Sequence, residues 1–409
     1  MIDRKKRIDS VLASFFYPNM IKVVNVMIKS AYIHIPFCEH ICHYCDFNKV
    51  FLQGQPVDEY IQMLKEEMRL QLAVYPTDEL KTIFVGGGTP TSLNEKQLAI
   101  LCETIDEMLP LNKPFGEYTF EANPGDLSRE KLEILYNAGV NRLSFGVQSF
   151  NDQLLQKIGR THRAADVYET IELAQKVGFS NISIDLIYGL PGQTMEDFQD
   201  TLNRALALDL PHYSSYSLIV EPKTVFYNLM QKGRLNLPPQ ELEASMYEQV
   251  MEVMERHGLH QYEISNFAKT GFESQHNLTY WNNAEYYGIG AGAHGYTQGK
   301  RIANYGPLKK YITPLQAGKL PVLEEHLVSL GEKMEEEMFL GLRKTEGVAL
   351  ELFKEKYFVE MEEVFSQPLK QQVEKGLLTI EDGFVRLTKQ GRLLGNEVFQ
   401  AFLGIVENS

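Results

Sequence analysis

Hydrophobic positions along the chain follow two alternating spacings. Short apolar, β-branched runs, typical of buried strands, are separated by stretches in which apolar residues recur every three or four positions, typical of amphipathic helices. The expected strands span residues 30–35, 81–85, 117–121, 142–147, 182–187 and 213–220. The expected helices between them span 57–74, 94–109, 128–137, 164–177 and 195–208, with Ser128 as an N-cap and Gly139 as a C-terminal stop. This alternation predicts an α/β fold whose six parallel strands form either an open barrel or a doubly wound sheet.

The pattern changes beyond this series. Pro238-Pro239 precedes a long expected helix at 240–257, which marks an annex, and residues 267–305 are rich in Gly, Tyr and Asn and expected to be irregular. From about Lys319 the chain predicts short amphipathic helices, followed by a helix, a turn and a β wing over 373–388. We therefore expect a barrel core at 27–235, an annex at 236–318 and a small winged-helix-like C-terminal domain at 319–409.

Composition narrows the class of protein. The 409 residues are 44% hydrophobic and 23% charged, as in ordinary globular proteins, and the net charge of −14 argues against broad binding of nucleic acid. No apolar run approaches the roughly 20 residues that span a bilayer, and the few cysteines suit a reducing cytosol. Residues 1–26 have a basic start and a short apolar part broken by Pro18, without a cleavage site, so we expect either an extension with no functional role or a start codon set too far upstream.

Three of the four cysteines lie within eight positions, directly after the first expected strand. Cys38, Cys42 and Cys45 form the spacing Cys-x3-Cys-x2-Cys, which supplies three soft ligands. A cubane iron–sulfur cluster normally takes four thiolates, so one iron would stay open. A zinc site that recruits His40 or His43, or cysteines with no shared ligand, remain alternatives. Cys102, in contrast, follows helical spacing on an apolar face and is expected in the core.

The residues around these cysteines, Tyr32-x-His34-Ile-Pro-Phe-Cys38-x3-Cys42-x-Tyr44-Cys45, resemble the signature of the radical S-adenosylmethionine (SAM) superfamily. Within it, the chain is similar to the branch that contains oxygen-independent coproporphyrinogen III oxidases (HemN) and heme chaperones (HemW). The resemblance implies a partial (β/α)6 barrel, a HemN-type C-terminal domain, a 4Fe–4S cluster on the three cysteines and SAM on its open iron. In this superfamily, reduction of the cluster cleaves SAM to a 5′-deoxyadenosyl radical.

The resemblance also implies a set of SAM contacts. Gly86-Gly87-Gly88-Thr89-Pro90 follows an expected strand, and its glycines would let the backbone approach a ligand closely. It is not a Walker A loop, because no Lys-Ser/Thr follows. By motif, the SAM residues are Tyr32, Tyr44, Gly87, Gly88, Thr89, Glu121, Gln148, Arg160 and Asp185.

A second motif, His276-Asn277-Leu278-Thr279-Tyr280-Trp281, contains the only tryptophan. Imidazole is a usual axial ligand of heme iron, and Tyr and Trp offer flat surfaces to a porphyrin. The motif resembles the HNxxYW sequence of the heme chaperone branch, which implies heme binding by His276, Asn277, Tyr280 and Trp281. His294, in Gly292-Ala293-His294-Gly295, is another candidate ligand, although a structural role is expected for it.

One departure separates the two relatives. The oxidases carry a further cysteine two positions after the third, where this chain has Phe47. We therefore expect a cytoplasmic heme chaperone of porphyrin metabolism that delivers heme to acceptor proteins such as respiratory hemoproteins. We expect it to bind heme and these acceptor proteins, and to contact a membrane only through the acceptors. If SAM is cleaved, an electron donor such as flavodoxin or ferredoxin is also expected. No nucleic acid is expected as a partner. The alternatives are oxidation of coproporphyrinogen III to protoporphyrinogen IX and an enzyme acting on RNA.

Overall fold

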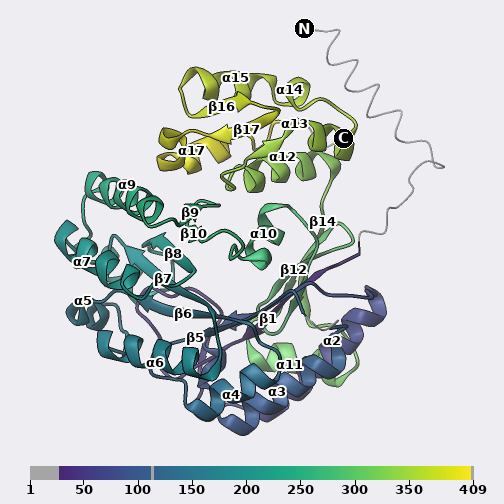
Figure 1. Cartoon of the computed structure of the whole chain (residues 1–409). Coiled ribbons are helices and arrows are strands. Elements are labelled where there is room, and N and C mark those ends of the chain that lie inside the picture. Colours follow the sequence, from purple (N-terminus) through teal and green to yellow (C-terminus); the bar gives the residue numbers. More distant parts are fainter. Residues whose placement is uncertain (1–26, 112–114, 407–409) are drawn as a thin grey trace.

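A curved, mostly parallel sheet forms the centre of the protein (Figure 1). The structure is a computed structural model that describes residues 27–111 and 115–406. Nine strands are ordered β11-β1-β4-β5-β6-β7-β8-β10-β9, so the sheet has two free edges and does not close. Its central strands pair in parallel, and they are β1 (Ser30–Ile35), β4 (Thr82–Gly87), β5 (Glu117–Ala122), β6 (Arg142–Gln148), β7 (Asn181–Tyr188) and β8 (His212–Ser217). The expected series of six strands in a partial barrel is confirmed.

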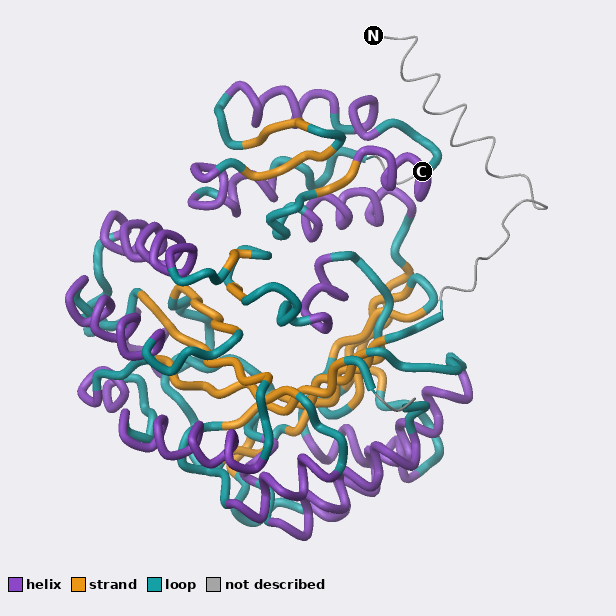
Figure 2. Tube along the Cα trace, viewed as in Figure 1, coloured by secondary structure: helices purple, strands orange, loops and turns teal. Residues whose placement is uncertain are grey.

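Helices cover the convex face of this sheet, whereas the C-terminal domain lies on its concave side (Figure 2). The expected helices are present as α2 (Val57–Val74), α3 (Glu95–Met108), α4 (Arg129–Asn137), α6 (Ala164–Val177), α7 (Met195–Leu206) and α9 (Gln240–Arg256). The Ser128 hydroxyl accepts a hydrogen bond from the Lys131 N–H, and Gly139 follows α4 with a φ of 90°. Both expected termini of α4 are therefore confirmed.

Residues 267–305, expected to be irregular, contain regular elements instead. They form α10 (Gln275–Trp281), β11 (Tyr287–Ile289), β12 (His294–Thr297) and β13 (Lys300–Asn304). This expectation was wrong because the strands have only three to five residues, too few to show a period, and because β11 is defined by its parallel pairing with β1, about 250 residues earlier. The sequence analysis also did not predict α5 (Asp152–Lys157), α8 (Val225–Gln231), β9 (His260–Gln261), β10 (Asn266–Ala268), α11 (Leu308–Gln316) and β14 (Val322–Leu327).

The C-terminal part has a small core of its own. One buried apolar cluster runs from Ile28 to Leu315, and another runs from Met334 to Phe402. The second joins an antiparallel sheet of order β15-β17-β16 to short helices, as expected for a winged-helix-like unit. Its elements are α12 (Leu330–Gly341), β15 (Val348–Ala349), α13 (Leu350–Tyr357), α14 (Met361–Val364), α15 (Ser366–Glu374), β16 (Leu378–Glu381), β17 (Phe384–Leu387), α16 (Lys389–Leu393) and α17 (Gly395–Gln400).

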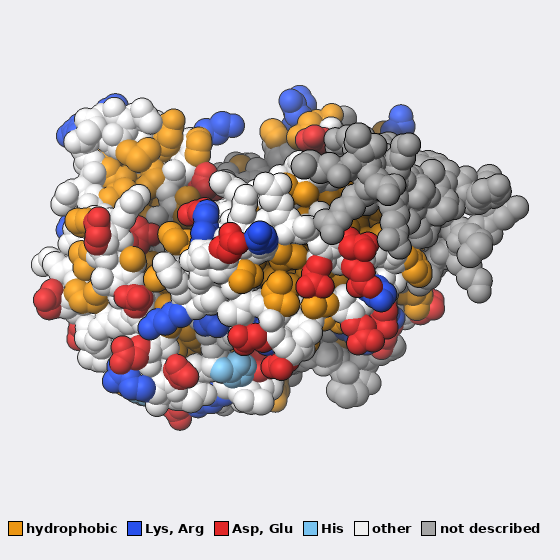
Figure 3. Space-filling view, turned by 90° about the horizontal axis from the view of Figure 1, so that it is seen from above, with side chains coloured by type: hydrophobic (Ala, Val, Ile, Leu, Met, Phe, Trp, Pro, Cys, Tyr) orange, Lys and Arg blue, Asp and Glu red, His pale blue; other side chains and the backbone are white. Residues whose placement is uncertain are grey.

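On the face seen from above, acidic, basic and apolar side chains are interspersed (Figure 3). Within residues 27–111 and 115–406, no helix has the length and apolar character needed to cross a membrane. The expectation for residues 1–26 lies outside the described residues.

Candidate functional site

The three clustered cysteines lie on a loop that the backbone closes at its base. Strand β2 (Phe37–Cys38) pairs in parallel with β3 (Val50–Phe51), and the Leu52 N–H donates to the Cys38 carbonyl at 2.9 Å. The Cys45 N–H donates to the Cys42 carbonyl at 3.3 Å, and Lys49 Nζ donates to the Cys45 carbonyl at 2.6 Å. All three thiols are free. The loop thus presents three sulfurs together with one nearby cation.

This donor set fits an iron–sulfur cluster. Burial raises the pKa of Cys38 to about 11, although the Thr89 hydroxyl opposes the shift, so a thiolate here needs a metal to stabilise its charge. Among the described residues, no three His, Cys, Asp or Glu side chains converge as the ligands of one metal ion would. The thiolates of a cubane bind different iron atoms and need not converge. His43, a candidate zinc ligand, donates through Nδ1 to the Lys157 carbonyl at 2.9 Å, and His40 is exposed.

The glycine loop packs directly on the start of the cysteine loop. The Gly88 N–H donates to the Ile35 carbonyl and the Thr89 N–H to the Phe37 carbonyl, both at 2.8 Å. A Cβ on Gly88 would lie 2.7 Å from the Phe37 oxygen, so no larger residue fits. The Thr89 hydroxyl lies 3.7 Å from the sulfur of Cys38. Glycine at this position therefore allows β4 to approach the cluster loop.

Two carboxyl groups lie on strands β5 and β7, which flank β6. Glu121 on β5 accepts the Gly87 N–H at 2.9 Å, and burial raises its pKa to about 7. Asp185 on β7 accepts the Ser144 hydroxyl at 3.4 Å, and burial raises its pKa as well. Buried carboxyl groups of this kind suit the amine and ribose hydroxyls of SAM. Gln148, at the end of β6, adopts a φ of 67°, a left-handed conformation that is uncommon outside glycine and often marks a functional position.

A chain of polar contacts links the remaining predicted SAM residues. Thr89 Oγ1 accepts a hydrogen bond from Asn123 Nδ2 at 3.2 Å, and Asn123 Oδ1 accepts one from Arg160 Nη1 at 2.5 Å. Arg160 also interacts with Tyr44. Arg160 Nε is buried without a hydrogen-bond partner among the described residues, as expected of a group reserved for a ligand carboxylate. Asn123 was missed from sequence, although its place just after the strand that carries Glu121 could have revealed it.

Tyr32 completes the predicted SAM set. Its hydroxyl donates to His34 Nδ1 at 2.9 Å, while His34 Nε2 donates to the Asn48 carbonyl at 2.7 Å. Tyr44, Thr89 and Arg160 thus lie together at the cysteine loop, whereas Tyr32 lies inside β1 and Asp185 inside β7. Residues from separate strand ends that meet in this way form a single site, as parallel α/β sheets usually provide.

His276 lies at the opposite, amino-terminal end of these strands and is fully buried. The Thr82 hydroxyl donates its proton to Ser30 Oγ, so its oxygen can only accept from His276. His276 Nδ1 therefore donates to Thr82 Oγ1 at 2.9 Å. Its Nε2 then accepts the Tyr280 hydroxyl at 2.7 Å. Both ring nitrogens are occupied, so His276 is not available as an axial heme ligand in this structure.

Helix α10 is held in place by Glu117, the first residue of β5. Its carboxylate accepts the hydroxyl of Ser274 at 3.0 Å, the N–H of Gln275 at 2.7 Å and the N–H of His276 at 3.1 Å. The Asn277 N–H donates to Ser274 Oγ at 3.3 Å. The first half of the HNxxYW motif, His276 and Asn277, therefore anchors α10 to the sheet. The second half, Tyr280 and Trp281, lies at the other end of this helix.

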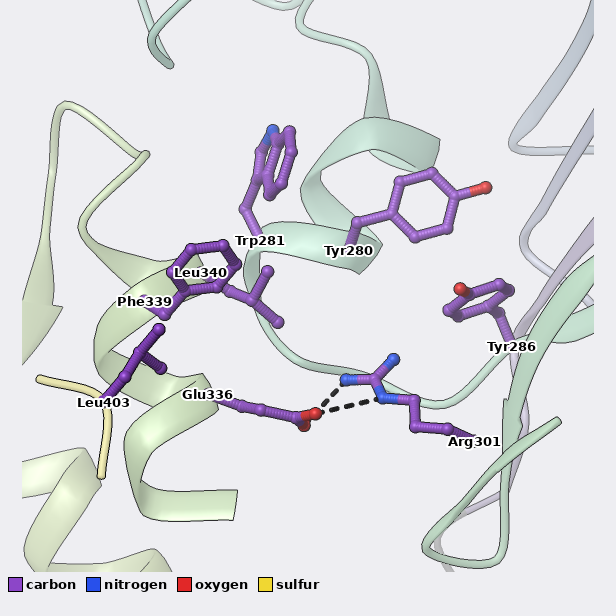
Figure 4. Close-up of a pocket in the computed structure, with 8 residues that line it drawn as sticks. All are labelled: Tyr280, Trp281, Tyr286, Arg301, Glu336, Phe339, Leu340 and Leu403. Atoms are coloured by element: carbon purple, nitrogen blue, oxygen red, sulfur yellow. Dashed lines mark hydrogen bonds and ion pairs between the residues drawn. The ribbon is translucent and has the colours of Figure 1, made fainter. Parts of the chain in front are cut away.

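That second half lines a cavity of about 560 Å³ between the sheet and the C-terminal domain (Figure 4). Arg301 lines the same cavity, and its guanidinium pairs with Glu336 on α12 at 2.8 Å, whereas the Trp281 ring lies 5.1 Å from the guanidinium of Arg343. Trp281 Nε1 is buried without a hydrogen-bond partner among the described residues. The other lining residues are Tyr286, Phe339, Leu340 and Leu403. Apolar walls with a few polar groups are typical of sites for flat organic ligands.

Comparison with known proteins identifies relatives of both parts of the chain. The model of the radical SAM superfamily matches residues 32–205, and that of the HemN C-terminal domain matches residues 328–394. The chain is 60% identical to the heme chaperone HemW of Bacillus subtilis over 92% of this chain and 99% of that protein. It is 47% identical to the heme chaperone HemW of Lactococcus lactis over 91% of this chain and 97% of that protein.

A solved structure shares the fold. Coproporphyrinogen III oxidase (HemN) from Escherichia coli superimposes with a TM-score of 0.81 over 93% of this chain and 91% of that one. The sequences are 22% identical, so this likeness concerns the fold alone.

Proposed function

This chain belongs to the radical SAM superfamily and, within it, to the HemW family of heme chaperones, and on that premise we propose that it binds heme and transfers it to acceptor hemoproteins. The observation that carries the proposal is the cavity lined by Tyr280 and Trp281 of the HNxxYW motif. Aromatic side chains of this kind stack on planar, apolar ligands. Respiratory hemoproteins are the acceptors we expect.

Membership of the radical SAM superfamily implies a 4Fe–4S cluster and SAM. We assign the cluster to Cys38, Cys42 and Cys45, and SAM to the set around the glycine loop. In that set, Arg160 would bind the SAM carboxylate through its unpaired Nε, while Glu121 and Asp185 would bind the amine and the ribose hydroxyls. With SAM bound, one electron from flavodoxin or ferredoxin would pass through the cluster to SAM for its reductive cleavage.

The heme residues divide into two roles. Tyr280 and Trp281 would contact the ligand, since both line the cavity. His276 and Asn277 would position α10 instead, because His276 is buried between Thr82 and Tyr280 and the Asn277 N–H contributes to the helix start. Arg301 is the cation at the cavity wall and suits a heme propionate.

The test is a heme titration of protein reconstituted without air. We expect saturable binding by the wild type, and binding weaker by about tenfold or more for Trp281→Ala, which removes one aromatic wall. Tyr136→Ala is the matched control, because Tyr136 is exposed on α4 on the outer side of the barrel. Transfer is then measured by mixing heme-loaded protein with an apo-hemoprotein, and a wild type that bound no heme would contradict the proposal.

The oxidase alternative is separated on the same sample. Phe47 occupies the place of the additional oxidase cysteine and is 62% exposed beside the cluster loop. Anaerobic incubation with SAM, reductant and coproporphyrinogen III is expected to yield no protoporphyrinogen IX. Turnover in this assay would favour the oxidase.

A further inference from the structure

A second cavity adjoins the one that Trp281 lines. It has a volume of about 410 Å³ and lies beside the cluster loop, where Phe47, Asn48 and His294 form part of its wall. Tyr280 and Tyr286 line both cavities and pack edge to face with ring centres 4.7 Å apart, so this pair of rings forms the wall between the cavities. A flat ligand larger than either cavity would extend across both when these two rings turn aside.

His294 is the histidine of this second cavity whose ring nitrogens are available to bind a metal. It is the first residue of β12, and its side chain is exposed, whereas the other residues of that strand are buried. No hydrogen bond of its ring occurs in the described part of the chain. His34 lines the same cavity, but both of its ring nitrogens are occupied by Tyr32 and the Asn48 carbonyl.

The β12–β13 pairing places His294 and Arg301 on one face of the hairpin. Tyr296 lies opposite Arg301, and the Arg301 guanidinium sits 3.9 Å from the centre of the Tyr296 ring. His294 precedes Tyr296 by two residues, so its side chain leaves the strand on the same side. The two residues are diagonal neighbours, with backbones about 7–8 Å apart. An imidazole and a guanidinium are thus presented side by side toward the two cavities.

We infer that heme lies across the two adjoining cavities, with His294 as the axial ligand of its iron and Arg301 as the partner of a propionate. The inference rests on the proposed function, because it names the atoms by which the same ligand is held. A neutral imidazole with a free nitrogen is a usual ligand of heme iron. Phe47 supplies apolar surface at the edge of the ring, and Arg301 exchanges the carboxylate of Glu336 for that of the propionate.

The experiment compares heme with metal-free protoporphyrin IX. His294→Ala is expected to weaken heme binding by at least tenfold and to remove the spectroscopic signature of imidazole ligation, while protoporphyrin IX binds as to the wild type because it has no iron to ligate. Added imidazole is expected to restore the signature. His257→Ala, which removes an exposed histidine at the end of α9, is the matched control.

The propionate contact has its own comparison. Arg301→Gln is expected to weaken binding of heme several-fold but not binding of heme dimethyl ester, whose propionates carry no charge. Unchanged heme affinity and spectrum in His294→Ala, with heme still bound by the wild type, would overturn the inference and leave the proposed function standing. Failure of the wild type to bind heme would overturn the proposed function itself. Equal loss of protoporphyrin IX binding in His294→Ala would show a structural role for His294 and also overturn the inference.

Discussion

His276 Nδ1 lies 2.9 Å from Thr82 Oγ1, which fastens the histidine of the HNxxYW motif to the first residue of β4. The ring also stacks on Phe84 at 5.4 Å and accepts the Tyr280 hydroxyl through Nε2. Since Tyr280 and Trp281 line the cavity, this contact sets the position of the residues that would touch the ligand. His276, the histidine of the motif, would therefore act on the ligand only indirectly, by positioning Tyr280 and Trp281.

Replacing His276 by Ala should lower the free energy of unfolding by about 2 to 4 kcal/mol, because it empties a buried site, leaves the Tyr280 hydroxyl without its acceptor and removes the donor to Thr82 Oγ1. Urea denaturation of the apoprotein measures the change. His257→Ala, at an exposed position at the end of α9, should lose no more than about 1 kcal/mol, the contribution of the hydrogen bond from its Nδ1 to the Val253 carbonyl. Equal stability of the two variants would contradict the buried network.

The pH dependence of the free energy of unfolding should also show that His276 is buried in its neutral form. Burial lowers the pKa of His276 to about 3, with the charge of Arg142 acting in the same direction, whereas an unfolded histidine titrates near 6.5. Between these values the unfolded chain binds more protons than the folded protein, so the stability contributed by His276 is present above pH 6.5 and is lost as the pH falls. The advantage of the wild type over His276→Gln should shrink by roughly 1.4 kcal/mol per pH unit between pH 6 and pH 4.

The comparison with His276→Gln isolates this one residue. Burial raises the pKa of both Glu121 and Glu263 to about 7, which favours the folded state at low pH, the opposite direction. Both groups are present in either protein and cancel in the difference. A pH-independent difference would show that His276 is protonated in the folded protein.

Cys42→Ala should lose nearly all iron and acid-labile sulfide after anaerobic reconstitution, because the two remaining thiolates, Cys38 and Cys45, are too few to hold a 4Fe–4S cluster. Cys102 provides the matched control, since it is buried on the apolar face of α3. Cys102→Ala should keep the wild-type content of iron and sulfide while losing about 1 kcal/mol of stability. Retention of the wild-type sulfide content by Cys42→Ala would remove Cys42 from the ligand set.

Arg160→Lys should weaken SAM binding by at least about tenfold, since lysine cannot keep the Asn123 contact and present a second planar donor to a carboxylate. Calorimetric titration of the reconstituted protein with SAM measures the affinity. Arg163→Lys, at an exposed position just before α6, should bind SAM as the wild type does. Equal affinities would assign the SAM carboxylate to another residue.

Sequence reasoning recovered the elements that are long and locally encoded. The six strands and the helices between them appear within a few residues of their expected bounds, because side-chain periodicity is a local property. It failed over residues 267–305, where strands such as β11 exist only through pairing with β1. It also missed Asn123, whose role depends on Thr89 and Arg160, 34 positions before it and 37 after it.

Spacing along the chain was enough to predict the three-cysteine loop, the glycine loop and the alternating series of strands and helices, whereas the spatial order of the strands is set by their tertiary pairing. Tertiary structure alone decided the roles of the histidines. His276 is buried because α10 is fastened at the amino ends of β4 and β5, and His294 is exposed because β12 begins at the edge of a cavity. Nothing in the residues adjacent to either histidine along the chain distinguishes these roles, and only the packing of distant strands around each ring leaves one of them a free nitrogen.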